Sequence, residues 1–202
     1  MLLKPVSRAA LCALLLLAAP AGAAQFEAGK HYAVIAEDPT EQPTVMEFFS
    51  YGCGACFQFD STFQQLKRVL GEQAEITYVP SDFGGGFWTP AQDLYLVLDA
   101  LGRREELHID AFAYFHTGSK PLNESTVKAF LAKNGVSEEQ YQKVRSSFAV
   151  HVKEKRYDQL TKRYRISSTP TVIVNGKYRV ESRELRNSQE FVQLVRHLLQ
   201  NP

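Results

Sequence analysis

The alternation of apolar and polar positions predicts a strand, a helix and a second strand in the first half of the chain. Apolar runs rich in β-branched and aromatic residues, at 44–50 and 74–79, are typical of buried strands. Between them, apolar residues recur at helical spacing, which predicts a helix from about Cys53 to Leu70 that ends at Gly71. Two strands joined by one helix are expected to be parallel neighbours in a sheet.

The second half of the chain is predicted to be helical, with a β-hairpin near its end. From 89 to about 165 nearly every segment has helical spacing, and we expect four short helices there and an amphipathic helix at the end of the stretch. Two apolar runs separated by Asn175-Gly176 are typical of a hairpin with a type I′ turn. A closing helix is expected from about Asn187, and residues 31–35 can supply a short edge strand. Helices between elements of one sheet predict an α/β fold with an inserted helical subdomain.

The first 23 residues have the pattern of a secretory signal peptide. Lys4 and Arg8 give a basic start, the apolar core at 9–19 is too short to span a bilayer, and small residues follow at 21–23. Cleavage after Ala23 is favoured over the alternative of an uncleaved anchor. We therefore expect an exported protein in a compartment that permits disulfides.

The composition fits one well-packed domain or a domain with an insertion. Hydrophobic residues make up 45% of the 202 residues, and neither the disordered nor the membrane class fits. The net charge is +1, and without Lys4 and Arg8 the mature part carries +1 − 2 = −1. No basic surface for binding nucleic acid is therefore predicted. Basic residues at 150–165 are interrupted by Glu154 and Asp158, as on the solvated face of an ordinary helix.

The chemistry of the chain is expected at its cysteines. Cys12 lies in the leader, so the mature chain keeps only Cys53 and Cys56. Cys53 falls at the N-cap of the predicted helix, where free N–H groups and the helix dipole stabilise a thiolate, and we expect a lowered pKa and a nucleophilic sulfur. A structural disulfide across so short a loop would stabilise little. A structural zinc site needs four ligands, and the scattered histidines do not offer them. Redox catalysis without metal or cofactor is the favoured interpretation.

Several motifs in a fixed order carry a resemblance to a known family. A strand that ends in Cys-x-x-Cys at a helix start is followed by a helical insertion, then by Thr169-Pro170 and a hairpin. This order resembles the thioredoxin-fold oxidoreductases, and most closely the DsbA family of periplasmic thiol:disulfide oxidoreductases. The resemblance implies a thioredoxin-like domain at 24–82 and 166–202 and a helical subdomain at 83–165. The matching stretches are Ala24-Gln25-Phe26-Glu27, Glu47-Phe48-Phe49-Ser50, Phe57-Gln58-Phe59 and Val174-Asn175-Gly176-Lys177-Tyr178.

The resemblance also implies roles for individual residues. Cys53 would be the attacking thiol and Cys56 the resolving one, and together they would form a redox-active disulfide. Pro170 matches the cis-proline of the family, with the backbone of Thr169 free to pair with substrate, whereas an ordinary strand-entry proline is the alternative. Glu47 matches a buried acid that relays the proton of Cys56, whereas a solvent-facing or ion-paired glutamate is the alternative.

Two positions depart from the pattern of the family. Members of the family commonly carry Pro-His between the cysteines, and here the dipeptide is Gly54-Ala55. The missing histidine predicts a higher pKa for Cys53 and a weaker oxidant. Tyr78 aligns with a lysine that pairs with the buried acid in the best-known members, and without that cation we expect Glu47 to be more protonated.

The function implied is the introduction of disulfides into reduced, unfolded exported proteins in the periplasm. Re-oxidation would come from a membrane quinone reductase similar to DsbB, and the short segment before the first strand favours a monomer. The alternatives are a reductase or isomerase, of which the isomerase is expected to be a dimer, and a peptide-binding chaperone without redox turnover. The chaperone would use an apolar surface formed by Phe83, Phe87, Trp88 and the Thr169-Pro170 loop.

Overall fold

The centre of the fold is a five-stranded sheet with the strand order β1-β5-β4-β2-β3. The computed structural model describes residues 26–86, 88–118 and 120–202. Only β2 and β3 run parallel, and the other neighbouring pairs are antiparallel. The predicted parallel pair and the predicted edge strand are therefore confirmed. The strands are β1 Tyr32–Val34, β2 Thr44–Phe49, β3 Glu75–Pro80, β4 Thr171–Val174 and β5 Tyr178–Val180.

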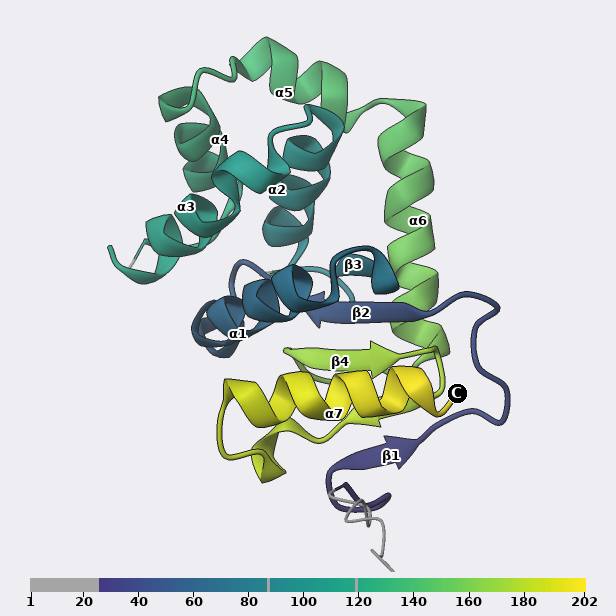
Figure 1. The fold of residues 1–202 in the computed structure, drawn as a ribbon. Coiled ribbons are helices and arrows are strands. Elements are labelled where there is room, and N and C mark those ends of the chain that lie inside the picture. Colours follow the sequence, from purple (N-terminus) through teal and green to yellow (C-terminus); the bar gives the residue numbers. More distant parts are fainter. Residues whose placement is uncertain (1–25, 87, 119) are drawn as a thin grey trace, which may run out of the picture.

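Two helices, α1 (Gly54–Leu70) and α7 (Ser188–Gln200), pack directly against the sheet. The first connects β2 to β3 through a 3-10 turn at Gly71–Gln73, and α7 ends the chain after a second 3-10 turn at Ser182–Glu184. The two helices lie side by side against the sheet (Figure 1). They begin and end within a residue or two of the positions that helical spacing predicts.

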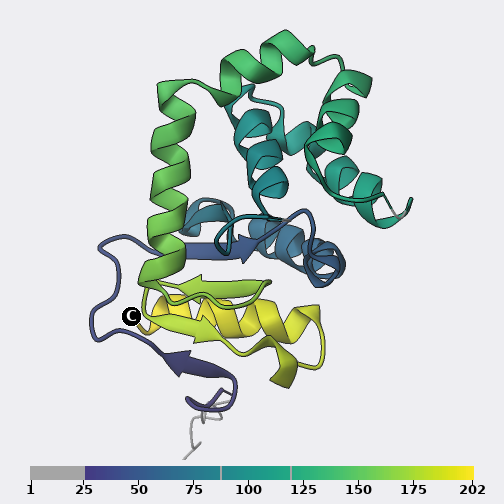
Figure 2. The ribbon, with the colours of Figure 1, turned by 180° about the vertical axis from the view of Figure 1, so that it is seen from behind.

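The other five helices come between β3 and β4 and form a layer beyond one end of the sheet (Figure 1). The last of them returns along the fold to the sheet (Figure 2). Just after its end, the ring of Tyr164 packs edge-on against Phe48 of β2. These helices are α2 Thr89–Ala100, α3 Arg104–His116, α4 Glu124–Lys133, α5 Glu138–Arg145 and α6 Phe148–Arg163.

One aromatic cluster joins the helical layer to the sheet. Five other rings have their centroids within 5.9 Å of the ring centroid of Phe49, at the end of β2. Two of these rings come from the sheet side of the fold and three from the inserted helices. Since aromatic pairs at this separation add to the energy of burial, the insertion and the sheet share one core directly behind the end of β2. The partner rings are Tyr51, Tyr78, Tyr95, His108 and Phe112.

The hairpin turn has the backbone that its sequence predicts. Asn175 and Gly176 have φ values of 51° and 62°, both positive as a type I′ turn requires. The Lys177 N–H closes the turn by donating to the Val174 carbonyl at 3.0 Å.

The α/β fold with a helical insertion is confirmed. The predicted leader at 1–23 lies outside the described residues, and the domain boundaries at 83 and 165 stay a prediction. Within the described part of the chain, no helix is long and apolar enough to cross a membrane.

Candidate active site

Cys53 occupies the N-cap of α1, as predicted. Its φ and ψ of −93° and 110° are extended, and its Sγ accepts a hydrogen bond from the Cys56 N–H at 3.2 Å. The preceding turn is held by Ser50, whose carbonyl accepts from the Cys53 N–H at 3.0 Å and whose hydroxyl accepts from the Gly52 N–H at 3.2 Å. The turn therefore aims the sulfur of Cys53 at the free N–H groups of the first helical turn.

The two sulfurs have opposite acidities. The pKa of Cys53 is lowered from 9.0 to about 6, chiefly by the hydrogen bond between the Cys53 and Cys56 side chains. Burial raises it in part, and hydrogen bonds with the side chain of Thr169 and with the backbone of Cys56 and Ala55 lower it. Burial raises the pKa of Cys56 far above its ordinary value, and its hydrogen bond to Cys53 adds to the effect. When the reduced pair has lost one of its two protons, the remaining proton therefore resides on Cys56 and the negative charge on Cys53.

The loop before β4 faces Cys53. The Thr169–Pro170 peptide bond is cis, as the resemblance implied. The Thr169 carbonyl lies 3.4 Å from Cys53 Sγ and accepts a hydrogen bond from the thiol when it is protonated. Residues 116 positions apart in the chain thus meet at the reactive sulfur.

Glu47 is buried in β2, with a relative exposure of 1%. It lies opposite Tyr78 in the parallel register of β2 and β3. Its Oε2 has no hydrogen-bond partner among the described residues. Its pKa is raised well above 4.5, first by burial and then by the charges of Asp60 and Cys53. The solvent-facing alternative is therefore wrong, while a role for Glu47 as a proton relay stays a prediction.

Tyr78 fills the position at which the resemblance implies a cation. Its hydroxyl accepts a hydrogen bond from Gln64 Nε2 at 2.9 Å. The nearest cations lie over its ring instead, with Lys67 Nζ at 5.3 Å and the Arg104 guanidinium carbon at 5.7 Å from the centroid. The positive charges in this part of the core thus contact the aromatic face and not the carboxyl group of Glu47.

A buried polar chain behind the cysteines escaped the sequence reasoning. Asp60 and His108 are each 4% exposed, and His108 Nε2 lies 3.0 Å from Asp60 Oδ1. The other ring nitrogen, Nδ1, lies 2.9 Å from the hydroxyl of fully buried Tyr51. With Nε2–H donating to the carboxylate, Nδ1 accepts from the Tyr51 hydroxyl, and the chain is satisfied. The one signal in the sequence is the spacing of Asp60 from Cys56 and Phe63 on the buried face of the helix.

A second histidine of α3 lies beside the Gly54-Ala55 dipeptide. His116 Nε2 donates to the Tyr51 carbonyl at 2.9 Å, and its ring stacks on Phe57 with an interplanar angle of 13°. A Cβ on Gly54 would lie 3.9 Å from His116 Nδ1. Although the dipeptide has no histidine, an imidazole from the helical layer therefore lies next to it.

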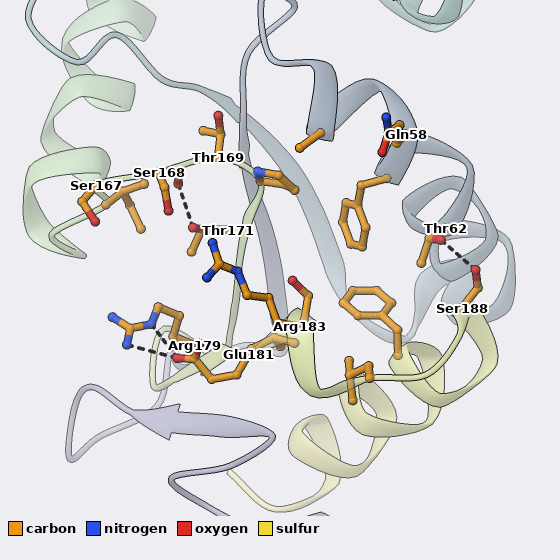
Figure 3. A pocket seen from close by; sticks show the side chains of 18 of the residues that line it. Gln58, Thr62, Ser167, Ser168, Thr169, Thr171, Arg179, Glu181, Arg183 and Ser188 are labelled. Carbon is orange, nitrogen blue, oxygen red and sulfur yellow. Dashed lines mark hydrogen bonds and ion pairs between the residues drawn. The ribbon is translucent and has the colours of Figure 1, made fainter.

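A groove of about 1030 Å³ runs from the start of α1 along the cis-proline loop. Figure 3 shows Gln58 and Thr62 of α1 on one side, and Arg179, Glu181 and Arg183 on the other. Thr169 and Pro170 line the groove where it meets the cysteine pair.

Comparison with known proteins places these features in one family. The family described as DSBA-like thioredoxin domain matches residues 44–195. The thiol:disulfide interchange protein DsbA of Pseudomonas syringae pv. tomato is 32% identical over 95% of this chain and 92% of its own length. The DsbA of Pseudomonas aeruginosa is 30% identical over 89% of this chain and 87% of its own.

Solved structures agree on the fold. The crystal structure of Pseudomonas aeruginosa DsbA superposes with a TM-score of 0.79 at 27% identity, covering 89% of this chain and 95% of that one. Proteus mirabilis DsbA, solved with a non-covalently bound peptide, has a TM-score of 0.75 at 20% identity and covers 88% of this chain and 100% of that one.

Proposed function

The chain belongs to the family of DsbA-like thioredoxin-domain proteins and is a thiol:disulfide oxidoreductase, and from this premise we propose that Cys53 and Cys56 donate a disulfide to reduced exported proteins in the periplasm. The observation that carries the proposal is the N-cap position of Cys53, whose sulfur accepts the Cys56 N–H. A sulfur stabilised as thiolate is a good leaving group, and it makes the dithiol form of the protein favourable.

The reaction begins with the two cysteines joined in a disulfide. A substrate thiolate attacks Cys53 Sγ, the Cys53–Cys56 bond breaks, and a mixed disulfide forms between substrate and Cys53. Cys53 is the sulfur that is open to attack, since Cys56 is completely buried whereas Cys53 is partly exposed. Cys56 leaves as a thiolate and needs a proton.

We propose that Glu47 supplies that proton. Burial raises the pKa of its carboxyl and so favours the protonated form, which has a proton to give. The charges of Asp60 and Cys53 raise this pKa further. A buried acid that senses the charge of the cysteine pair suits a group that gives its proton to the leaving sulfur.

The second step releases the product. A second thiolate of the substrate attacks the substrate sulfur of the mixed disulfide, and Cys53 leaves with the electron pair. The substrate has then lost two electrons and two protons to the cysteine pair, which ends as the dithiol. Return to the disulfide form requires a two-electron acceptor, and we propose a membrane quinone reductase similar to DsbB.

We propose that the backbone of the substrate binds along the cis-proline loop. Thr169 lies beside Cys53 at the mouth of the groove, and an extended peptide can add to it by backbone hydrogen bonds. A related DsbA, from Proteus mirabilis, was solved with a bound peptide, which supports a peptide substrate here.

We propose that the cysteine pair is a disulfide donor of intermediate oxidising strength. Cysteines in Cys-x-x-Cys motifs and at helix starts have pKa values from about 3.5 to 7.5, and the value of about 6 for Cys53 falls in the upper part of this range. Because a higher pKa stabilises the dithiol form less, this value supports the weaker oxidant that the Gly54-Ala55 dipeptide predicts.

Two other functions remain as alternatives. The first is a reductase or isomerase. An isomerase is expected to be a dimer, whereas we propose a monomer, and light scattering after size-exclusion chromatography distinguishes the two oligomeric states. A chaperone without redox turnover would use an apolar surface formed by Phe83, Phe87, Trp88 and the Thr169-Pro170 loop. Phe83 and Trp88 are half-buried and pack their rings edge-on at 5.0 Å, and Phe87 lies outside the described residues. Substrate oxidation by the Cys53→Ser variant separates this alternative from catalysis by the cysteine pair.

Oxidation of a reduced, unfolded model protein tests the proposal. The oxidised protein should form disulfides in the substrate in stoichiometric amounts, and Cys53→Ser should abolish the reaction. Cys56→Ser is first converted at Cys53 to its mixed disulfide with glutathione by treatment with oxidised glutathione. The thiolate of a substrate with a single cysteine should then attack Cys53 Sγ and release glutathione, and the resulting mixed disulfide should persist because no resolving thiol is present. It is visible as a mass increase over the unmodified variant equal to the mass of the substrate less two hydrogens. Substrate oxidation by the Cys53→Ser variant at the wild-type rate would exclude catalysis by this pair.

A further inference from the structure

The groove beside the cysteine pair carries an excess of positive charge. Its lining includes four arginines and a single acid, Glu181, which gives 4 − 1 = +3. The chain as a whole has a net charge of only +1, so the excess is local to the groove. The four arginines are Arg165, Arg179, Arg183 and Arg186.

Two of the arginines are already neutralised within the protein. Arg179 pairs with Glu181 at 3.1 Å, and Arg186 pairs with Glu190 at 3.0 Å. Among the described residues, Arg165 and Arg183 make no ion pair of this kind, and both are exposed. Their guanidinium groups are therefore free to pair with a carboxylate of a bound molecule, for which their planar shape is suited.

The floor of the groove is apolar. Phe59 of α1 and Phe191 of α7 meet edge-on at 5.1 Å, and both line it. Leu185 and Pro170 also line the groove, and Pro170 does so beside the cysteine pair. An apolar floor with unpaired arginines at its rim fits a peptide that carries both apolar and acidic side chains.

The position of the groove decides which peptide occupies it. Ala55, which lies between the two cysteines in the first turn of α1, lines one end together with Thr169 and Pro170. When the cysteine of a substrate is bonded to Cys53, the residues that flank it must therefore pass into or along the groove.

We propose that the groove selects acidic substrates: extended segments in which aspartate or glutamate flanks the reacting cysteine. This inference rests on the proposed function and names the substrate class of the same site. Arg165 and Arg183 contact the acidic side chains, while the apolar floor receives neighbouring hydrophobic residues. Selection acts on the encounter and on the mixed disulfide, and high salt weakens it because the contacts are exposed.

Two reduced peptides of equal length test the proposal. One has aspartates on both sides of its cysteines and the other has lysines at the same positions. Second-order rate constants for their oxidation are measured with the oxidised protein, its Arg165→Gln/Arg183→Gln variant and an Arg68→Gln/Arg196→Gln control. The control removes the same charge from exposed positions on α1 and α7 that do not line the groove. Any difference in thiol pKa between the peptides is the same for all three proteins and cancels in the comparison.

We expect the Arg165→Gln/Arg183→Gln variant to oxidise the acidic peptide about fivefold more slowly and the basic peptide faster. The control should change the ratio of the two rates by less than about twofold. In the wild type, about 0.5 M salt should bring the ratio close to its value in the groove variant.

Equal rate ratios in the wild type and the groove variant would overturn the acidic selection, and so would an equal loss in the control. In both cases the peptides are still oxidised, so the proposed function survives. If the wild type oxidised neither peptide, the proposed function itself would fail.

Discussion

The low pKa of the Cys53 thiol predicts that the free energy of unfolding of the reduced protein depends on pH through the ionisation of this one sulfur. The pKa is about 6 in the folded protein against an ordinary value of 9.0. Because folding lowers the pKa, it favours the thiolate. The stabilisation is therefore complete above pH 9 and is lost as the pH falls through about 6.

The magnitude follows from the interval between the two values. Each pH unit is worth about 1.4 kcal/mol, so the three units between 6 and 9 give a ceiling of about 4 kcal/mol. At pH 8 two of those units are realised, or about 2.7 kcal/mol. Since Cys53 is partly exposed, solvent screening reduces the expected effect to about 2 kcal/mol. At pH 5 the term is close to zero.

Urea unfolding of the reduced protein at about pH 5 and about pH 8 measures this term. The control is the reduced Cys53→Ser variant, because serine keeps the N-cap hydrogen bond but does not ionise. Cys56 does not interfere, since its thiol stays protonated in both states over this interval. The wild type should gain about 2 kcal/mol more than the variant between the two pH values. Equal gains would refute a stabilised thiolate at Cys53.

Two further substitutions test the surroundings of the cysteine pair, and a third tests the hairpin turn. Glu47→Gln should lose less stability than the wild type as the pH rises above 4.5, because only the wild type buries a carboxyl whose pKa is raised; it should also slow single-turnover reduction of the oxidised protein about tenfold, and an unchanged rate would exclude the proton relay. His108→Phe should cost about 2–4 kcal/mol in urea unfolding, since it takes the imidazole partner from a buried carboxyl and a buried phenol, whereas exposed His151→Phe should cost almost nothing. Gly176→Ala should cost about 1–2 kcal/mol more in thermal unfolding than Gly29→Ala: both glycines have positive φ, but only at 176 would the Cβ lie 2.9 Å from the Tyr164 hydroxyl, so equal losses would contradict the contact.

The parts of the fold that depend on local sequence could be predicted. The N-cap of α1, its end at Gly71 and the Asn175-Gly176 turn each follow from a few neighbouring residues, whose backbone preferences leave few other conformations. The reactive sulfur was found for the same reason, because a cysteine at a helix start has a lowered pKa in any fold.

The parts of the site that join distant segments could not be predicted. Asp60 and His108 are 48 residues apart, and nothing in either segment indicates that they meet. His116 approaches Gly54 only because α3 packs over α1. The same packing places one imidazole, that of His116, beside a dipeptide that has no histidine of its own.

The burial of Glu47 was predicted from the family resemblance and not from the local sequence pattern. A glutamate in an apolar strand is compatible with either face of the sheet, and only the likeness to a known family favoured burial. Its closeness to Asp60 required the three-dimensional arrangement, since the two carboxyl groups come from β2 and α1.

The equilibrium of the purified protein with a glutathione redox buffer tests the central claim most directly. A disulfide donor must be easier to reduce than ordinary structural disulfides. Alkylation and mass spectrometry at equilibrium count the protein with free Cys53 and Cys56. We expect most of the protein to be in the dithiol form, whereas protein that stays mostly oxidised would contradict donation of disulfides by this pair.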